Sequence, residues 1–124
     1  MKPELSPHIR RLEELILGFK PNVVEYEGGI HGTALFRERE IAVQVASTRK
    51  PAYLDRHAHA AVEVIVVFSG RFIFEFDDGK EEEVKTSQVI RIPIGVPHAC
   101  RADAESRAIG ILIPAEKGYP DVSR

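Results

Sequence analysis

Apolar residues that alternate with polar ones dominate the chain from about residue 22 to about residue 113. Two series are clearest: Ile41, Val43, Val45 and Phe72, Phe74, Phe76. Because successive side chains of a strand point to opposite faces, this spacing predicts strands with one face against a core. Strands are expected over residues 23–27, 33–36, 41–48, 52–59, 63–68, 71–76, 80–85, 88–92, 98–102 and 106–113.

Turn signals separate these runs. Asp77, Asp78 and Gly79 have the Asp-Gly signature of a tight hairpin, and the polar run 80–85 after it is expected at a sheet edge or against water. Many short strands at this spacing favour a sandwich or a barrel. The predicted fold class is therefore all-β.

Short segments flank the β region. Ser6 and Pro7 precede apolar residues at helical spacing, which predicts one short helix. We expect an N-terminal helical extension over residues 1–21, a β-barrel over residues 22–114 and a C-terminal tail over residues 115–124. A length of 124 residues with 44% hydrophobic residues fits one such domain.

Composition argues against several function classes. The net charge of −2 supplies no field to attract nucleic acid or an anionic membrane surface. The longest apolar run, residues 64–68, is far shorter than the ~20 residues that cross a bilayer. The single cysteine, Cys100, cannot form an intramolecular disulfide or a cysteine-based zinc site. We therefore expect a cytoplasmic protein with no nucleic-acid partner and no membrane partner.

Candidate metal ligands gather at two places. His57 and His59 lie two residues apart on an expected strand, so their side chains project into one space. Glu63 can join them only if the chain turns after Ala60, because a straight strand would carry it ~20 Å beyond His57. Farther along, two prolines and a glycine form a rigid turn that delivers His98 at the start of a strand.

These residues resemble a known family. The string His57-x-His59-x-x-x-Glu63, followed after six residues by Gly70, and then Pro93-x-Gly95-x-x-His98 are similar to the two motifs of the cupin superfamily, in particular its small single-domain bacterial members. The resemblance implies a jelly-roll β-barrel. It also implies one divalent transition metal ion (Fe, Mn, Ni, Co or Zn), bound by His57, His59, Glu63 and His98. Gly70, Pro93 and Gly95 would form turns.

The sequence departs from the family motifs at three positions. The glycines that usually open the two motifs would fall at Pro51 and Ser87, and the asparagine that closes the second motif would fall at Ala102. These departures concern backbone shape rather than metal chemistry. Burying Glu63 beside three imidazoles without an ion would be costly, which favours a metal site over an ordinary polar core.

Three further residues are candidates for the pocket. Cys100 lies two residues after His98 and is expected to share its inward face, where the simpler alternative is a small buried apolar side chain. Arg91 would bind an anionic substrate if it pointed inward, and otherwise carries a solvated charge. Tyr53 lies four residues before His57, so the two side chains are expected on the same face of the strand. His8 and His31 are expected to be ordinary hydrogen-bonded side chains.

The resemblance allows several functions. The first hypothesis is a small metal-dependent dioxygenase acting on an enolic or dicarbonyl small molecule, with Glu63 as a ligand and as a base. The alternatives are a non-catalytic module that binds or senses a small molecule or a carbohydrate, and a metal-dependent sugar isomerase or epimerase. Cupins are commonly dimers, and the edge strands together with the apolar stripe of the expected helix predict a homodimer here.

Overall fold

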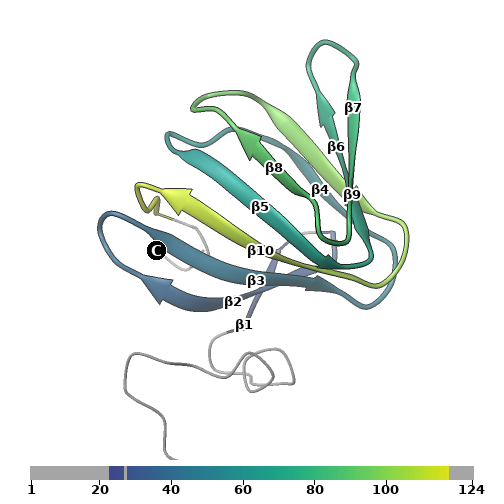
Figure 1. The fold of residues 1–124 in the computed structure, drawn as a ribbon, viewed down its shortest axis with the longest axis horizontal. Helices are drawn as coiled ribbons and strands as arrows, with labels where there is room; N and C mark the ends of the chain where they lie inside the picture. Colours follow the sequence, from purple (N-terminus) through teal and green to yellow (C-terminus); the bar gives the residue numbers. More distant parts are fainter. Residues whose placement is uncertain (1–22, 27, 118–124) are drawn as a thin grey trace, which may run out of the picture.

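Two antiparallel sheets face each other and carry every strand that the structure describes (Figure 1). The computed structural model describes residues 23–26 and 28–117, so the predicted N-terminal helix lies outside the described residues. The strands are β1 (Val23–Tyr26), β2 (Ile30–Arg37), β3 (Ala42–Thr48), β4 (Ala52–His57), β5 (Val62–Ser69), β6 (Arg71–Phe76), β7 (Glu81–Lys85), β8 (Val89–Ile92), β9 (His98–Ala102) and β10 (Ser106–Ile113).

The strand order follows a jelly-roll arrangement. One sheet has six strands in the order β1-β2-β3-β10-β5-β8, and the other has four in the order β4-β9-β6-β7. The chain passes between the sheets at the β3–β4, β4–β5, β5–β6, β7–β8, β8–β9 and β9–β10 connections. All the strands predicted from the alternation are present, so the all-β prediction is confirmed. The largest boundary differences are at β2, which is longer than predicted, and at β4, which ends at His57 rather than at His59.

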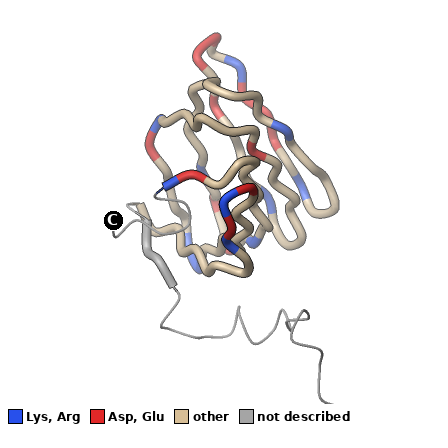
Figure 2. Tube along the Cα trace, turned by 90° about the vertical axis from the view of Figure 1, so that its left-hand side faces the viewer, with Lys and Arg blue, Asp and Glu red and all other residues tan. Residues whose placement is uncertain are grey.

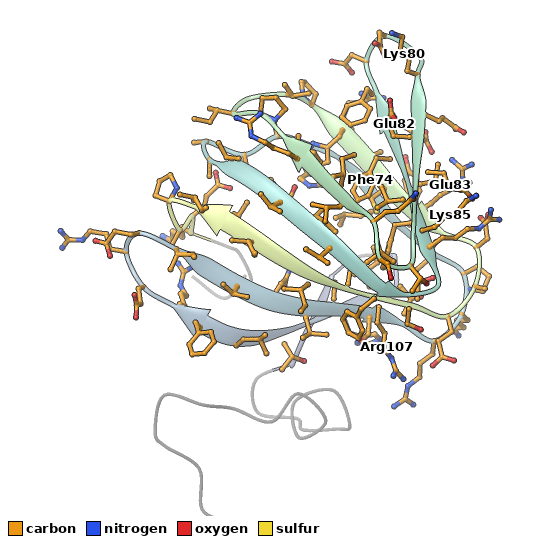
Figure 3. The ribbon with its side chains drawn as sticks, viewed as in Figure 1. Phe74, Lys80, Glu82, Glu83, Lys85 and Arg107 are labelled. Atoms are coloured by element: carbon orange, nitrogen blue, oxygen red, sulfur yellow. The ribbon has the colours of Figure 1, made fainter. Side chains whose placement is uncertain are left out.

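The core lies between the two sheets. Phe72 and Phe74 are 3% and 2% exposed and pack with apolar residues of β5, β7, β8, β9 and β10. Figure 3 shows Phe74 directed toward the space between the sheets. The prediction that this series of phenylalanines faces the core is confirmed, with Phe76 at its partly buried end. None of the candidate metal ligands belongs to this apolar cluster, so its burial contributes to the stability of the barrel independently of them.

Strand β3 presents Gln44 and Ala46, rather than its valines, to the interior cavity. Val45 is buried, yet Gln44 and Ala46 line the interior cavity, so the face predicted from Ile41, Val43 and Val45 is not the one that lines it. In the register of the sheet, Gln44 lies opposite Gly110 and Ala46 lies opposite Ala108. Alternation indicates a strand but does not say which face turns inward when both faces carry apolar residues. The small inward residues leave room for a cavity.

The polar strand β7 lies at the edge of the four-stranded sheet, as predicted. Glu81, Glu82 and Glu83 are exposed, and Val84 is the buried residue of this strand. Figure 3 shows the charged side chains of this hairpin away from the core, and Figure 2 shows residues of both signs interspersed along the tube. Among the described residues, no helix is long and apolar enough to cross a membrane.

Candidate metal centre

The segment that joins β4 to β5 carries three of the candidate ligands. The pairing of β4 with β9 shifts register between Leu54 and His57, and His57 then lies opposite His98. His59 follows the end of β4, and the chain bends at Ala60 and Ala61 before β5 begins. Glu63 is therefore brought back beside the two histidines. The predicted turn is confirmed, whereas the prediction that the strand continues to His59 is wrong, because the irregular pairing ends the ladder early.

A tight turn before β9 delivers the fourth candidate ligand. Gly95 has φ +76°, a conformation that glycine adopts without strain, and Val96 donates a backbone hydrogen bond to Pro93 O (3.3 Å). His98 then opens β9 and is 1% exposed. The turn predicted from the Pro-Gly-Pro pattern thus positions His98 as expected.

The four side chains converge on one point inside the barrel. His57, His59, Glu63 and His98 each offer one ligand atom, and these atoms lie within 4.8 Å of one another. Glu63 Oε1 is 3.1 Å from His98 Nε2 and 3.6 Å from His59 Nε2. The ring centroids of His57 and His98 are 4.3 Å apart. Such spacing brings the donors close enough to share one ion.

The hydrogen bonds behind the rings fix which nitrogen faces this point. Nδ1 of His57 lies 2.8 Å from Asp55 O, and Nδ1 of His98 lies 2.9 Å from Val96 O. Because a carbonyl oxygen only accepts, both Nδ1 atoms carry the proton. Each neutral ring then directs the Nε2 lone pair inward. Imidazole lone pairs beside a carboxylate form a donor set that suits a divalent transition metal ion. The four candidate ligands therefore fit such an ion.

The electrostatics of the site support this arrangement. Burial lowers the pKa of His57 and outweighs the hydrogen bond to Asp55 O that raises it. Burial also acts to lower the pKa of His98, but its hydrogen bonds with Glu63 and with Val96 O outweigh burial and raise it. A proton or a metal ion between His98 Nε2 and Glu63 Oε1 satisfies both atoms, so protons and metal compete there.

The candidate ligands lie in the wall of a cavity of about 390 Å³. Most of the remaining wall is apolar, and Gln44 supplies a buried amide. The lining residues outside the ligand set are Ile30, Gln44, Ala46, Leu54, Asp55, Arg56, Ile65, Phe72, Phe74, Cys100, Ala108 and Gly110. A cavity of this size with a few convergent polar groups is typical of a small-molecule site.

Of the three further pocket candidates from the sequence, Cys100 lines the cavity and Tyr53 and Arg91 do not. Cys100 lines the cavity and is 6% exposed, and burial raises the pKa of its thiol, which makes it a buried apolar side chain rather than a reactive thiolate. Tyr53 is 42% exposed, and Arg91 is also exposed; within the described chain, neither lines the cavity. Arg91 pairs with Val64, on the outer side of the sheet, because Glu63 and its partner Ile92 face inward. His31 lies on β2, away from the cavity.

Sequence reasoning missed three residues around the site. Gln44 stands between two valines, and a polar residue within this apolar run was the available signal. Arg56 lines the cavity and forms an ion pair with Asp77. Glu116, in the segment predicted as a tail, lies against His59, with its Oε2 2.6 Å from Nδ1. No local sequence pattern indicates that contact.

Comparison with known proteins agrees with the geometry. The profile of the family described as "Cupin domain" matches residues 46–114. A search of the curated proteins finds no significant match. Among solved structures, an RmlC-like cupin from Shewanella frigidimarina has 21% identity and a TM-score of 0.75, over 92% of this chain and 96% of that chain.

Two other solved structures are similar. A cupin superfamily protein from Desulfitobacterium hafniense has 15% identity and a TM-score of 0.69, over 91% of this chain and 94% of that chain. KdgF from Halomonas sp. has 18% identity and a TM-score of 0.67, over 76% of this chain and 88% of that chain. At such identities the likeness shows a shared fold, and function has to be argued from the site.

Proposed function

The chain belongs to the cupin domain family, and on that premise we propose that it is a small metal-dependent dioxygenase acting on an enolic or dicarbonyl molecule. The observation that carries the proposal is the position of the four candidate ligands, His57, His59, Glu63 and His98, in the wall of a mostly apolar cavity. A divalent transition metal held there would supply open positions for a chelating ligand and for redox or Lewis-acid chemistry.

The cavity wall favours one substrate class over others. Leu54, Ile65, Phe72 and Phe74 form an apolar wall, whereas the polar and charged lining residues are the candidate ligands together with Gln44, Asp55 and Arg56. A molecule with an apolar body and two adjacent oxygens fits this division, because its oxygens face the polar end. A sugar would bury several hydroxyl groups against apolar carbon, each at a cost of about 1–3 kcal/mol when unpaired. The wall therefore favours an enolic substrate over the substrate of a sugar isomerase.

The protein's own groups have distinct tasks in the proposed reaction. The three imidazoles act as neutral ligands whose orientation is fixed through Nδ1. Glu63 is 5% exposed and acts first as a ligand. Its carboxylate is also the base that would take the proton of an enol hydroxyl, since it is the acidic side chain in the ligand set. The apolar wall keeps bulk water away from the reacting atoms.

A binding module without turnover is the second candidate, because the same cavity can hold a small apolar ligand. Protein reduced and loaded with iron(II) would be tested for oxygen consumption with flavonols, β-diketones and catechols. We expect oxygen uptake with at least one substrate in the wild type and none in His59→Ala. Ligand-induced thermal shifts without oxygen uptake would favour the binding module, and failure to bind any transition metal would overturn the dioxygenase proposal. Elemental analysis of untagged protein identifies the metal to be used.

A further inference from the structure

His59 is held differently from the other two histidines of the candidate site. His57 and His98 each direct Nδ1 to the carbonyl oxygen two residues earlier, which is a local contact. His59 directs Nδ1 to Glu116, which is 57 positions away in the sequence. His59 also lies beyond the end of β4, so no strand ladder fixes its backbone. The orientation of its imidazole ring therefore depends on a distant side chain, whereas its backbone carbonyl is held separately by the N–H of Gly95.

Both carboxylate oxygens of Glu116 form hydrogen bonds. Oε2 lies 2.6 Å from His59 Nδ1, and Oε1 accepts a hydrogen bond from the backbone N–H of Ala60 at 2.7 Å. One carboxylate thus spans the ring of His59 and the peptide that follows it. The short distances are typical of hydrogen bonds to a charged acceptor. These contacts lower the pKa of Glu116 although its burial acts to raise it.

The backbone around Glu116 is anchored to the barrel. Arg37 Nη1 donates to Glu116 O (3.1 Å), and the N–H of Ala115 donates to Arg39 O (3.2 Å). The Ala115 side chain packs on a small cluster that contains Ala61. Replacing the Glu116 side chain leaves these backbone contacts available, so the segment is expected to stay in place.

We propose that Glu116 is the positioning residue of the metal centre, which holds His59 as the Nδ1–H tautomer with Nε2 turned toward the other ligands. This inference rests on the metal-dependent function proposed above. A carboxylate behind a ligating histidine fixes the ring and raises its basicity, and loss of such a partner typically costs about 10–100-fold in metal affinity. Glu116 itself offers no atom to the candidate ligand set.

The first test is zinc affinity, measured at pH 7.5 by competition with a chelator. We expect Glu116→Ala to bind zinc about 10–100-fold more weakly than the wild type, because His59 loses both its tautomer and its orientation. Glu116→Gln keeps an oxygen that accepts the Nδ1–H and is expected to recover part of the loss. Glu105→Gln is the matched control, since Glu105 pairs with Arg107 at the surface and is expected to leave zinc affinity unchanged.

The second test is independent of metal. Long-range ¹H–¹⁵N NMR of the metal-free protein reports which nitrogen of His59 carries the proton. We expect the Nδ1–H form in the wild type and in Glu105→Gln, and a mixture of tautomers in Glu116→Ala. If Glu116→Ala unfolds, the zinc affinity of Glu116→Gln decides the question, because it is expected to fall below that of the wild type. Wild-type zinc affinity in both Glu116 variants, or an unchanged tautomer in a folded Glu116→Ala, would overturn the inference. Absence of zinc binding in the wild type would instead overturn the proposed function. The tautomer comparison would still test whether Glu116 positions His59.

Discussion

The backbone N–H of Gly95 donates a hydrogen bond to the carbonyl oxygen of His59 at 2.9 Å. This bond joins the segment that carries His57 and His59 to the turn that delivers His98. The two parts of the candidate site come from separate stretches of sequence, and the contact fixes them relative to each other. The geometry of the candidate metal centre therefore depends on the backbone of a residue outside the candidate ligand set.

Replacing Gly95 by alanine is expected to weaken metal binding and stability together. Gly95 has φ +76°, and an added Cβ would meet open space, so the cost comes from the left-handed backbone alone, roughly 1–2 kcal/mol. Relaxation of that strain would move the turn and the N–H that holds His59, and we expect metal affinity to fall on the order of 10-fold. Urea unfolding and chelator competition measure the two effects.

Gly79 provides a matched control. It also has positive φ (+81°) with open space around its Cβ position, but it lies in the β6–β7 hairpin turn. Gly79→Ala should lose about the same stability as Gly95→Ala, roughly 1–2 kcal/mol, and keep wild-type metal affinity. Equal metal affinity in the two variants would show that the Gly95 turn does not position the ligands.

Replacing Ser87 by glycine is expected to stabilise the protein. Ser87 has φ +74°, and it stands where the cupin motif usually has a glycine. Glycine adopts this conformation without a Cβ clash, although it adds entropy to the unfolded chain, so we expect a net gain of about 0.5–1 kcal/mol. Ser69→Gly, at the exposed end of β5, is the control and should lose about 0.5–1 kcal/mol. A higher urea midpoint for Ser69→Gly than for Ser87→Gly would contradict this account.

The sequence predicts the strands through local rules, and it predicts the candidate ligand set through its resemblance to the cupin motifs. Alternation of apolar residues indicates each strand, and the spacing of His57, His59 and Glu63 implies a turn that the structure contains. The contact of Glu116 with His59 could not be predicted in this way, because it joins residues 57 positions apart through an irregular segment. The orientation of Arg91 and Tyr53 could not be predicted for a related reason, since strand parity alone does not say which face turns inward.

We propose that the protein is a homodimer that covers the outer face of the six-stranded sheet. Val64 and Val66 on β5 lie opposite Ile111 and Ile109 on β10, on the face away from the cavity, and all are only partly buried. Sedimentation of the wild type is expected to give about twice the chain mass of 13.9 kDa. Val66→Lys should give a monomer because it places a charge in the apolar face. Lys80→Glu, in the hairpin, should leave the mass unchanged; a wild-type monomer would contradict the proposal.

Removing a ligand is expected to release the metal and leave the fold intact. His59→Ala and Glu63→Gln should each lose most of the bound metal, while far-UV circular dichroism keeps its β signature. The reason is that the apolar cluster around Phe72 and Phe74 holds the sheets together independently. His31→Ala, away from the cavity, is the control. If the variants keep stoichiometric metal, the site assignment is wrong, and if they unfold, the ion is structural and the oxygenase proposal loses its main support.

Metal affinity is expected to fall as the pH falls, because each proton bound to an imidazole removes a ligand. The pKa of His98 is raised above the ordinary value of 6.5 through its pairing with Glu63, so His98 takes up its proton first and affinity begins to weaken near neutral pH. The pKa of His57 is lowered, so His57 stays neutral to a lower pH and its loss adds to the decline below about pH 6. Zinc competition across about pH 5–8, corrected for chelator protonation, measures this curve.

The Glu63→Gln variant distinguishes the effect of His98 protonation on zinc affinity from the effect of His57 protonation. Glutamine cannot stabilise a protonated His98 by charge, so the pKa of His98 should drop, and the weak residual zinc affinity should stay flat through neutral pH before it declines. Circular dichroism at each pH distinguishes loss of metal from loss of fold. An affinity that does not change across the range would mean that histidines are not the ligands. A Glu63→Gln curve parallel to that of the wild type would mean that Glu63 does not control His98.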